Sequence, residues 1–377
     1  MFPFTFHTLR RIVIPIILIY LFLAALFYIH SLNLNPQKAP DFGFDKKKPI
    51  DGPLVMRDNI FEDGQRKVIG GVVLLNPMTL DQGDPPIQKL NSTPVEDLKV
   101  NEEFLKGLIR KSKKIHDKND LVMFTMINDA YLNLTLNWLC NTYSLPGQSV
   151  HDKTVFVTVG NETCKRIQKD WPKVECVEMK ADSAYGSAMD WGTNGYAKFL
   201  EARLKMIIKL VEANLNLVIF ETDAVWWKNP MQLFHEAFNN TETDLTIPVN
   251  FKETNGQKFA FDPMCVRPTY ETKTVFKEIQ ESLKSQKKLM DQDILNAKCA
   301  KKSIRCKSFK WSDVADGKWF KMSQKERKNY KPYIVNNNYY IGAKNKMSRQ
   351  ALNNAWFLSP KGICNSSKTK KALAKQA

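Results

Sequence analysis

Residues 217–230 read LVIFETDAVWWKNP, and this stretch decides which kind of fold the chain can have. Four apolar residues lead directly into Glu221 and Asp223, and two tryptophans follow shortly after. An uninterrupted apolar run of this kind is typical of a buried strand. A buried strand that ends in two carboxylates needs a positive partner there, because an unpaired charge is costly to bury. The sequence therefore predicts a strand that presents two acids to a cation or to a basic side chain.

Strands and amphipathic helices alternate on both sides of this stretch. The predicted strands are LVMFTMIN, TVFVTV, VECVEM, NLVIFE, DLTIPVN, KFAFDPMCVRP and YIVNNNYYIG. Helices are predicted around YLNLTLNWLC, over residues 196–213 and 270–287, and from DQDILN onwards. This alternation predicts an α/β fold with a mostly parallel sheet flanked by helices. Ligands of such sheets bind at the carboxyl ends of the strands, which makes Asn128 and the asparagines at 336–338 candidates beside the two acids.

An uncharged apolar segment, IVIPIILIYLFLAALFYI, covers residues 12–29. As a helix it would be roughly 27 Å long, about the thickness of an early secretory membrane. Arg10 and Arg11 precede it, so the positive-inside rule predicts a signal anchor with a cytosolic tail at 1–11 and a luminal remainder. A cleaved signal peptide is the alternative, although its apolar region is normally shorter and followed by a small-residue cleavage site.

The luminal part divides into three segments by composition. Residues 30–118 are rich in Pro, Gly, Asp and Lys, which indicates a stem, with a helix near 95–115. Residues 119–365 carry the α/β pattern, and residues 366–377 form a basic tail. N-glycosylation sequons agree with a luminal address and begin at Asn91, Asn133, Asn161, Asn239 and Asn365.

Charge and cysteine content narrow the class of protein further. The 377 residues carry a net charge of +17. In a secretory lumen this charge indicates acidic glycans, nucleotide phosphates or a membrane surface as partners, with no nucleic acid; a lysine-rich solvated surface is the plain alternative. Seven cysteines allow at most three disulfides, and no C-x2-C pair suggests a zinc site.

The E-T-D turn offers hard oxygen ligands that suit Mg²⁺ or Mn²⁺. A metal held by few protein groups keeps positions for substrate phosphates, where it neutralises charge on a diphosphate leaving group. A solvated turn with incidental acids is the structural alternative. The phosphate-loop, dinucleotide and serine-hydrolase motifs are absent from the sequence.

Arg203 lies within the apolar stripe of the predicted helix at 196–213. A guanidinium on an apolar face needs either a carboxylate, such as Glu221 or Asp223, or a bound phosphate. Asp291 and Asp293 open a helix, where capping is the plain interpretation. Trp226 and Trp227 are either core residues or a stacking surface for a sugar.

Taken with the predicted anchor and stem, these motifs resemble Golgi glycosyltransferases of the GT-A fold. More narrowly, the chain is similar to the nucleotide-diphospho-sugar transferase family that includes plant cell-wall xylosyl- and arabinosyltransferases. The resemblance covers about 121–356 and rests on NDAYLNLTLNWLCN, the block at 196–230, VRPT, DQDILN and YIVNNNYYIGAKNKMSR. The chain departs from the family pattern at Glu221, where Asp is more common, at Asn336, where many relatives carry a histidine, and at FAFDPM, which replaces N-x-G.

The resemblance implies a role for each candidate residue. Glu221 and Asp223 would hold Mn²⁺ or Mg²⁺. The donor site would include Asn128, Tyr196, Arg203, Thr222, Asn336 and Asn337. Asp291, Gln292 and Asp293 would form the catalytic segment near the transferred sugar and the acceptor.

The resulting hypothesis is a single-pass type II Golgi membrane glycosyltransferase. It would move a sugar from a nucleotide diphosphate donor to a luminal glycan or glycoprotein acceptor, assisted by a metal. The alternative is a catalytically inactive luminal protein of the same fold that binds glycans or assists a partner transferase.

Overall fold

A computed structural model describes residues 98–376, apart from 161, 182, 188, 190–192, 251–257 and 286–289, and three short strands before them. These strands form an antiparallel sheet and are β1 (Glu62–Asp63), β2 (Arg66–Ile69) and β3 (Val72–Leu74). All described residues belong to one compact unit, Asn59–Ala377. The predicted anchor at 12–29 and most of the predicted stem lie outside the described residues. Within the described part of the chain, no helix is long and apolar enough to cross a membrane.

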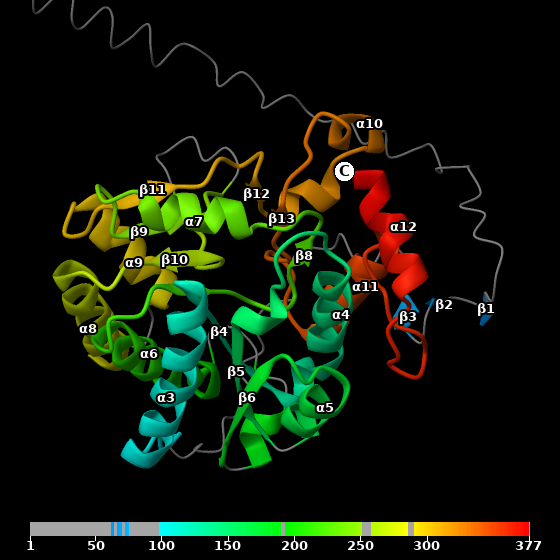
Figure 1. Ribbon diagram of the computed structural model, residues 1–377. Coiled ribbons are helices and arrows are strands. Elements are labelled where there is room, and N and C mark those ends of the chain that lie inside the picture. The colour runs from blue at the N-terminus through cyan, green and yellow to red at the C-terminus, as the bar shows by residue number, and fades with distance from the viewer. Residues whose placement is uncertain are drawn as a thin grey trace, which may run out of the picture. The chain divides into compact units, whose positions relative to one another are not determined.

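A seven-stranded sheet in the order β11-β9-β10-β7-β4-β5-β6 forms the centre of the unit (Figure 1). Its strands are β4 (Val122–Asn128), β5 (Thr154–Val159), β6 (Glu175–Met179), β7 (Leu217–Ile219), β9 (Leu245–Ile247), β10 (Met264–Val266) and β11 (Cys306–Ser308). Every pairing in this sheet is parallel except those of β10, which runs antiparallel to β7 and β9. The predicted α/β fold with a mostly parallel sheet is therefore confirmed.

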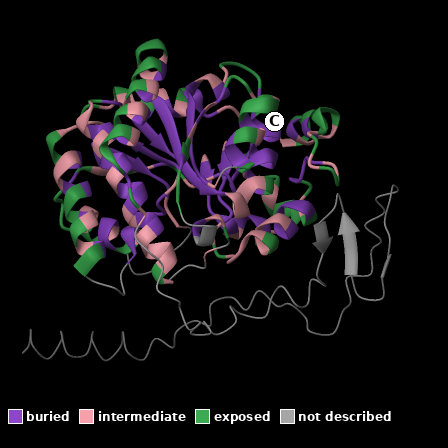
Figure 2. Ribbon diagram, turned by 90° about the horizontal axis from the view of Figure 1, so that it is seen from below, coloured by how far each residue is buried: buried purple, intermediate pink, exposed green. Residues whose placement is uncertain are grey.

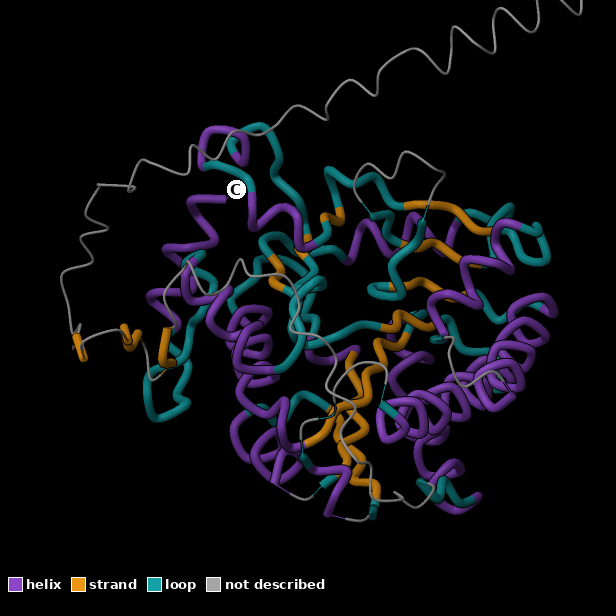
Figure 3. Tube along the Cα trace, turned by 180° about the vertical axis from the view of Figure 1, so that it is seen from behind, coloured by secondary structure: helices purple, strands orange, loops and turns teal. Residues whose placement is uncertain are grey.

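Helices cover both faces of the sheet. One face packs against α3 (Glu102–Asn119), α6 (Asn194–Glu212), α8 (Tyr270–Ser285) and α9 (Asp291–Ala300). The other packs against α4 (Leu132–Tyr143), α5 (Glu162–Asp170), α7 (Met231–Asn239), α11 (Ala343–Leu352) and α12 (Ser366–Gln376). Successive residues of a strand point to opposite faces, so Val122 and Phe124 enter the first core and Met123 the second. Both faces are buried, as the colours of Figure 2 show, and the trace in Figure 3 shows the same layering from behind.

Two segments that the sequence analysis placed outside the α/β region pack onto it. Helix α3, predicted at 95–115 as part of the stem, contacts β4, β5 and β6 and buries Leu105 and Leu108. Helix α12, predicted as a basic tail, contacts α4 and buries Leu373. Both helices have an apolar face, and burying that face against the α/β region is favourable because it removes apolar surface from water.

A second, three-stranded sheet lies beyond the acidic turn. It has the order β12-β13-β8 and consists of β12 (Val314–Ala315), β13 (Ile334–Val335) and β8 (Val225–Trp226). The predicted strand YIVNNNYYIG is wrong in extent, since only Ile334 and Val335 pair as a strand and the asparagines follow it. Val335 pairs with Val225, and this register brings Asn336 beside the end of the acidic turn.

Three disulfides are present, the number that the sequence allowed. They are Cys140–Cys364, Cys164–Cys176 and Cys299–Cys306. Cys265 is a buried free thiol. Cys140–Cys364 ties α4 to the segment just before α12 and so fixes the C-terminal helix to the sheet layer.

An aromatic cluster fills the core behind the acidic turn. Trp226 and Trp227 are 0% and 3% exposed, so they are core residues. Trp138 stacks on Phe220 at 4.7 Å between ring centroids. His151 lies at the edge of this cluster, 5.4 Å from the ring of Trp171 and 2% exposed.

The buried imidazole of His151 makes the stability of this fold dependent on pH. Burial lowers the pKa of His151 to about 4, against opposing effects of the Leu139 carbonyl and Asp152. Because the unfolded state binds a proton near pH 6.5 and the folded state does so only near pH 4, stability falls as the pH drops through this window. We expect the free energy of unfolding to lose roughly 3 kcal/mol from this residue between pH 6.5 and 4.

Urea unfolding of the wild type and of His151→Gln at a series of pH values tests this expectation. The free energy of unfolding of the variant should change less between pH 6.5 and 4 than that of the wild type, because glutamine does not titrate. Equal slopes for the two proteins would contradict the assignment.

Candidate active site

The acidic turn follows β7 at the carboxyl edge of the sheet. Ile219 pairs with Phe124 in the middle of β4, so the turn that follows β7 lies beside the second half of β4. Thr222 and Asp223 are each 2% exposed, whereas the side chain of Glu221 keeps 35% of its surface exposed. The two acids therefore differ, since the Glu221 side chain is partly exposed beside Arg203 and Asp223 is buried.

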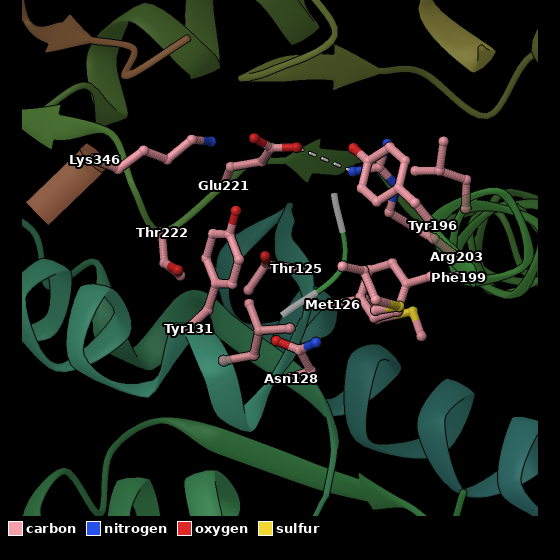
Figure 4. A pocket seen from close by; sticks show the side chains of 13 residues that line it. Thr125, Met126, Asn128, Tyr131, Tyr196, Phe199, Arg203, Glu221, Thr222 and Lys346 are labelled. Atoms are coloured by element: carbon pink, nitrogen blue, oxygen red, sulfur yellow. Dashed lines mark hydrogen bonds and ion pairs between the residues drawn. The ribbon is translucent and has the colours of Figure 1, made fainter. Parts of the chain in front are cut away.

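Glu221 borders a cleft that encloses about 600 Å³ of empty space, part of it open to solvent. In Figure 4, Lys346 lies on one side of Glu221, Tyr196 and Arg203 lie on the other, and the Tyr131 hydroxyl points toward Glu221 from below. The full lining consists of Thr125, Met126, Ile127, Asn128, Tyr131, Met189, Tyr196, Phe199, Leu200, Arg203, Glu221, Thr222 and Lys346. Aromatic walls with a few charged groups at one end suit a ligand that is part ring and part anion.

Arg203 joins the acidic turn to the start of α9. Its Nη1 lies 3.3 Å from Glu221 Oε1, and its Nη2 lies 2.6 Å from Asp291 Oδ2. Burial works to lower the pKa of Arg203, but the charges of Asp291 and Glu221 outweigh it and raise the pKa. Of the two partners that the sequence left open for Arg203, the structure shows carboxylates.

The DQD segment separates into different roles. Asp291 is buried and combines two contacts, since its Oδ2 pairs with Arg203 and its Oδ1 accepts a hydrogen bond from the first-turn N–H of Gln292 at 2.8 Å. Asp293 is exposed, and its carboxylate accepts a hydrogen bond from the Met290 N–H at 3.3 Å, as expected of a capping residue. Gln292 is half-buried, and neither it nor Asp293 lines the cleft.

Lys346 is the positive partner of Asp223, a residue that the sequence analysis did not identify. Its ammonium forms an ion pair with Asp223 Oδ2. Burial acts to lower the pKa of Lys346, while Asp223 and Tyr131 raise it and prevail. One sequence pattern could have indicated this role. Lys346, Arg349 and Gln350 are polar and have the i, i+3, i+4 spacing of one helix face.

Helix α11 also fixes the backbone around this ion pair. Gln350 Nε2 donates to the carbonyl of Asp223 at 2.6 Å. Arg349 Nε donates to Asn337 Oδ1 at 2.6 Å, and Asn337 Nδ2 donates to the Lys346 carbonyl at 3.1 Å. Asn337 therefore ties its loop to α11 instead of lining the cleft.

A third acid, Asp262, lies near the turn and was also missed. It belongs to the FAFDPM segment, and the Asn336 amide donates to its carbonyl. Burial and then the charges of Glu221 and Asp223 raise its carboxyl pKa well above the ordinary value. Burial and Asp223 likewise raise the pKa of Glu221. These shared effects place the three acids in one charged neighbourhood.

Two amide oxygens of predicted donor-site residues lack a hydrogen-bond partner among the described residues. Asn128 Nδ2 donates to the carbonyls of Tyr185 and Ser187 at 3.0 and 2.7 Å, which leaves Oδ1 as a buried unpaired acceptor at the cleft floor. Asn336 Oδ1 is buried and unpaired in the same way. Buried acceptors are nearly always satisfied, so these two oxygens are available to accept a hydrogen bond from a bound group.

Of the remaining predicted donor-site residues, Thr222 and Tyr196 line the cleft and Asn336 does not. Thr222 lies 3.1 Å from Thr135, hydroxyl to hydroxyl, which anchors the turn to α4. Tyr196 is at the start of α6, and burial raises the pKa of its hydroxyl. Across the described part of the chain, no three side chains of His, Cys, Asp or Glu group closely enough to hold a metal by themselves.

Comparison with known proteins identifies relatives of this chain. Over 255 residues it is 26% identical to UDP-D-xylose:L-fucose alpha-1,3-D-xylosyltransferase 1 of Arabidopsis thaliana, covering 62% of this chain and 69% of that protein. It is 24% identical over 224 residues to the Arabidopsis thaliana arabinosyltransferase XEG113, covering 56% of this chain and 32% of that one. The crystal structure of mouse xyloside xylosyltransferase 1, apo form, superposes on 58% of this chain with a TM-score of 0.37 and 9% identity, covering 98% of that structure.

The family profile described as nucleotide-diphospho-sugar transferase matches residues 149–350. The match spans more than half of the chain and contains the acidic turn, α6, α9 and most of α11. The chain therefore belongs to the nucleotide-diphospho-sugar transferase family.

Proposed function

We propose that this protein is a glycosyltransferase that moves a sugar from a nucleotide diphosphate donor to a luminal glycan or glycoprotein acceptor. The observation that carries the proposal is the cleft beside Glu221, where aromatic walls meet Arg203 and Lys346. Family membership supports the reaction class. Because the relatives are named for UDP-D-xylose and arabinosyl transfer, a uridine diphosphate pentose is the first donor to test.

The cleft would hold the donor with its base toward Asn128 and its diphosphate toward the acidic turn. The unpaired Asn128 Oδ1 would accept a hydrogen bond from a base N–H. Tyr131, Tyr196 and Phe199 supply flat apolar surface on the cleft walls. Lys346, at the opposite end of the lining from Asn128, supplies positive charge for phosphate oxygens.

A divalent cation, Mn²⁺ or Mg²⁺, fits the residues at the turn. Glu221 and Asp223 supply carboxylate oxygens, and the unpaired Asn336 amide oxygen lies beside the turn, so the donor set is made of the hard ligands such ions prefer. When bound, the metal would neutralise charge on the diphosphate leaving group. Arg203 would orient Glu221, and Asp291 would act by holding Arg203 in place.

The proposed setting is the Golgi membrane, with residues 12–29 as a type II signal anchor. The uncharged apolar segment at these residues supports the anchor, and the three disulfides agree with an oxidising compartment. An inactive protein of the same fold is the second candidate, and one observation favours it. Lys346 already neutralises Asp223, one of the two proposed metal ligands.

Donor binding should be visible as thermal stabilisation that depends on Mn²⁺. A nucleotide sugar at 100 times its Kd adds about 2.7 kcal/mol to the free energy of unfolding. For a domain of this size we expect the Tm to rise by roughly 5–10 °C. Scanning fluorimetry with UDP-xylose, UDP-arabinose, UDP-galactose and a GDP-sugar, with and without Mn²⁺, measures the shift. A Tm that no donor moves would favour the inactive alternative.

Asp223→Asn should abolish transfer because it removes a metal ligand, with a loss of about 100-fold or more in kcat/KM. The matched control is Asp244→Asn. Asp244 is a fully buried aspartate that pairs with Arg305 at 2.7 Å, and neither residue lines the cleft. Both variants should lower the Tm, because each takes a buried carboxylate out of its ion pair.

Assays of sugar transfer and of Mn²⁺-dependent donor hydrolysis distinguish the loss of a metal ligand from the loss of stability. Asp244→Asn should keep both activities after correction for the folded fraction. Equal losses in the two variants would mean that Asp223 is a structural residue and that the metal assignment is wrong.

A further inference from the structure

Lys346 forms an ion pair with the Asp223 carboxylate, which is one of the two proposed metal ligands. Its side chain is 13% exposed and that of Asp223 is 3% exposed, so the ion pair is largely shielded from water. Lys346 also lines the cleft, and its ammonium lies 5.8 Å from the centre of the Tyr131 ring. The ammonium therefore adjoins both the metal ligand and the space proposed for the donor.

Arg203 and Lys346 differ in the number of acids that hold them. Among the ion pairs of the described residues, Arg203 has two carboxylate partners, Glu221 and Asp291, and Lys346 has one, Asp223. If a metal takes Glu221, Arg203 stays paired with Asp291. If a metal ion binds Asp223, the ammonium of Lys346 loses its carboxylate partner and lies close to the metal ion. Two neighbouring cations shielded from water repel each other, so this arrangement is unfavourable unless an anion binds beside them.

Hydrogen bonds fix the backbone at Lys346, whereas its side chain is a flexible four-carbon chain that ends in the ammonium. Asn337 donates to the Lys346 carbonyl at 3.1 Å, and Gln350, one turn later, holds the Asp223 carbonyl at 2.6 Å. A change of partner by Lys346 therefore requires rotation of one side chain and no movement of α11. The cleft beside it offers the space into which the ammonium would turn.

We propose that Lys346 is an internal counter-ion of Asp223 that opposes metal binding until a nucleoside diphosphate enters the cleft. The inference rests on the proposed function and adds a binding order to it. The diphosphate gives the displaced ammonium a new partner, so metal and nucleotide each strengthen the binding of the other. This coupling is reciprocal, because both ligands act on the same ion pair.

Titration of the full chain with Mn²⁺, with and without UDP, tests the inference by electron paramagnetic resonance of the free ion. For the wild type we expect UDP to tighten Mn²⁺ binding by about 10-fold or more. In Lys346→Met, Mn²⁺ alone should bind about 10-fold more tightly than in the wild type, and UDP should tighten it further by a clearly smaller factor than in the wild type, because only the contact between metal and diphosphate remains. Lys346→Arg keeps the charge and should keep the wild-type coupling.

Lys298→Met is the matched control, since Lys298 is a partly shielded lysine paired with Glu278 at 2.6 Å on the surface of α9. It should leave both Mn²⁺ affinities unchanged. If Lys346→Met does not fold, Lys346→Gln removes the same charge and makes the same comparison of Mn²⁺ affinities.

The two possible failures are distinct. If UDP does not tighten Mn²⁺ binding to the wild type, or if Lys346→Met binds Mn²⁺ alone no more tightly, the counter-ion role is overturned and the metal site stands. If the wild type binds no Mn²⁺ even with UDP, the metal-assisted function fails, and this inference fails with it.

Discussion

The site depends on one electrostatic constraint, which is that carboxyl groups gathered at the edge of the sheet must be matched by positive charge. The acids of this neighbourhood are Glu221, Asp223, Asp262 and Asp291. Among the described residues that form ion pairs with them, the basic side chains are Arg203 and Lys346. Acids outnumber bases, and burial together with the charges of neighbouring acids raises the carboxyl pKa of Glu221 and Asp262. Such a site favours the arrival of further positive charge.

The two bases reach the acids from opposite layers of the fold. Arg203 comes from α6, which packs on one face of the sheet, and Lys346 comes from α11, which packs on the other. Asp223 lies 123 residues before Lys346 in the chain, and Arg203 lies 88 residues before Asp291. The charged cluster therefore forms only when both cores are in place, which links folding of the domain to assembly of the site.

Local patterns in the sequence were enough to predict the sheet, the acidic turn and the buried position of Arg203. Each depends on apolar periodicity over a few turns or on a single strand end. Lys346 and Asp262 were not predictable in this way, because their roles depend on partners far away in the chain. Asp291 shows the same limit, since a local rule sees a capping position and the structure shows an ion pair with α6.

The two acids of the turn are not equivalent, and the longer arm of Glu221 accounts for the difference. Asp223 is held from inside, by Lys346 at its carboxylate and Gln350 at its carbonyl. Glu221 keeps 35% of its side chain exposed and still reaches Arg203 at 3.3 Å. A cation that enters from the cleft would therefore meet Glu221 first and Asp223 second. A glutamate at this position thus allows one contact with the cation before the buried ion pair has to open, so the substitution is compatible with a metal site.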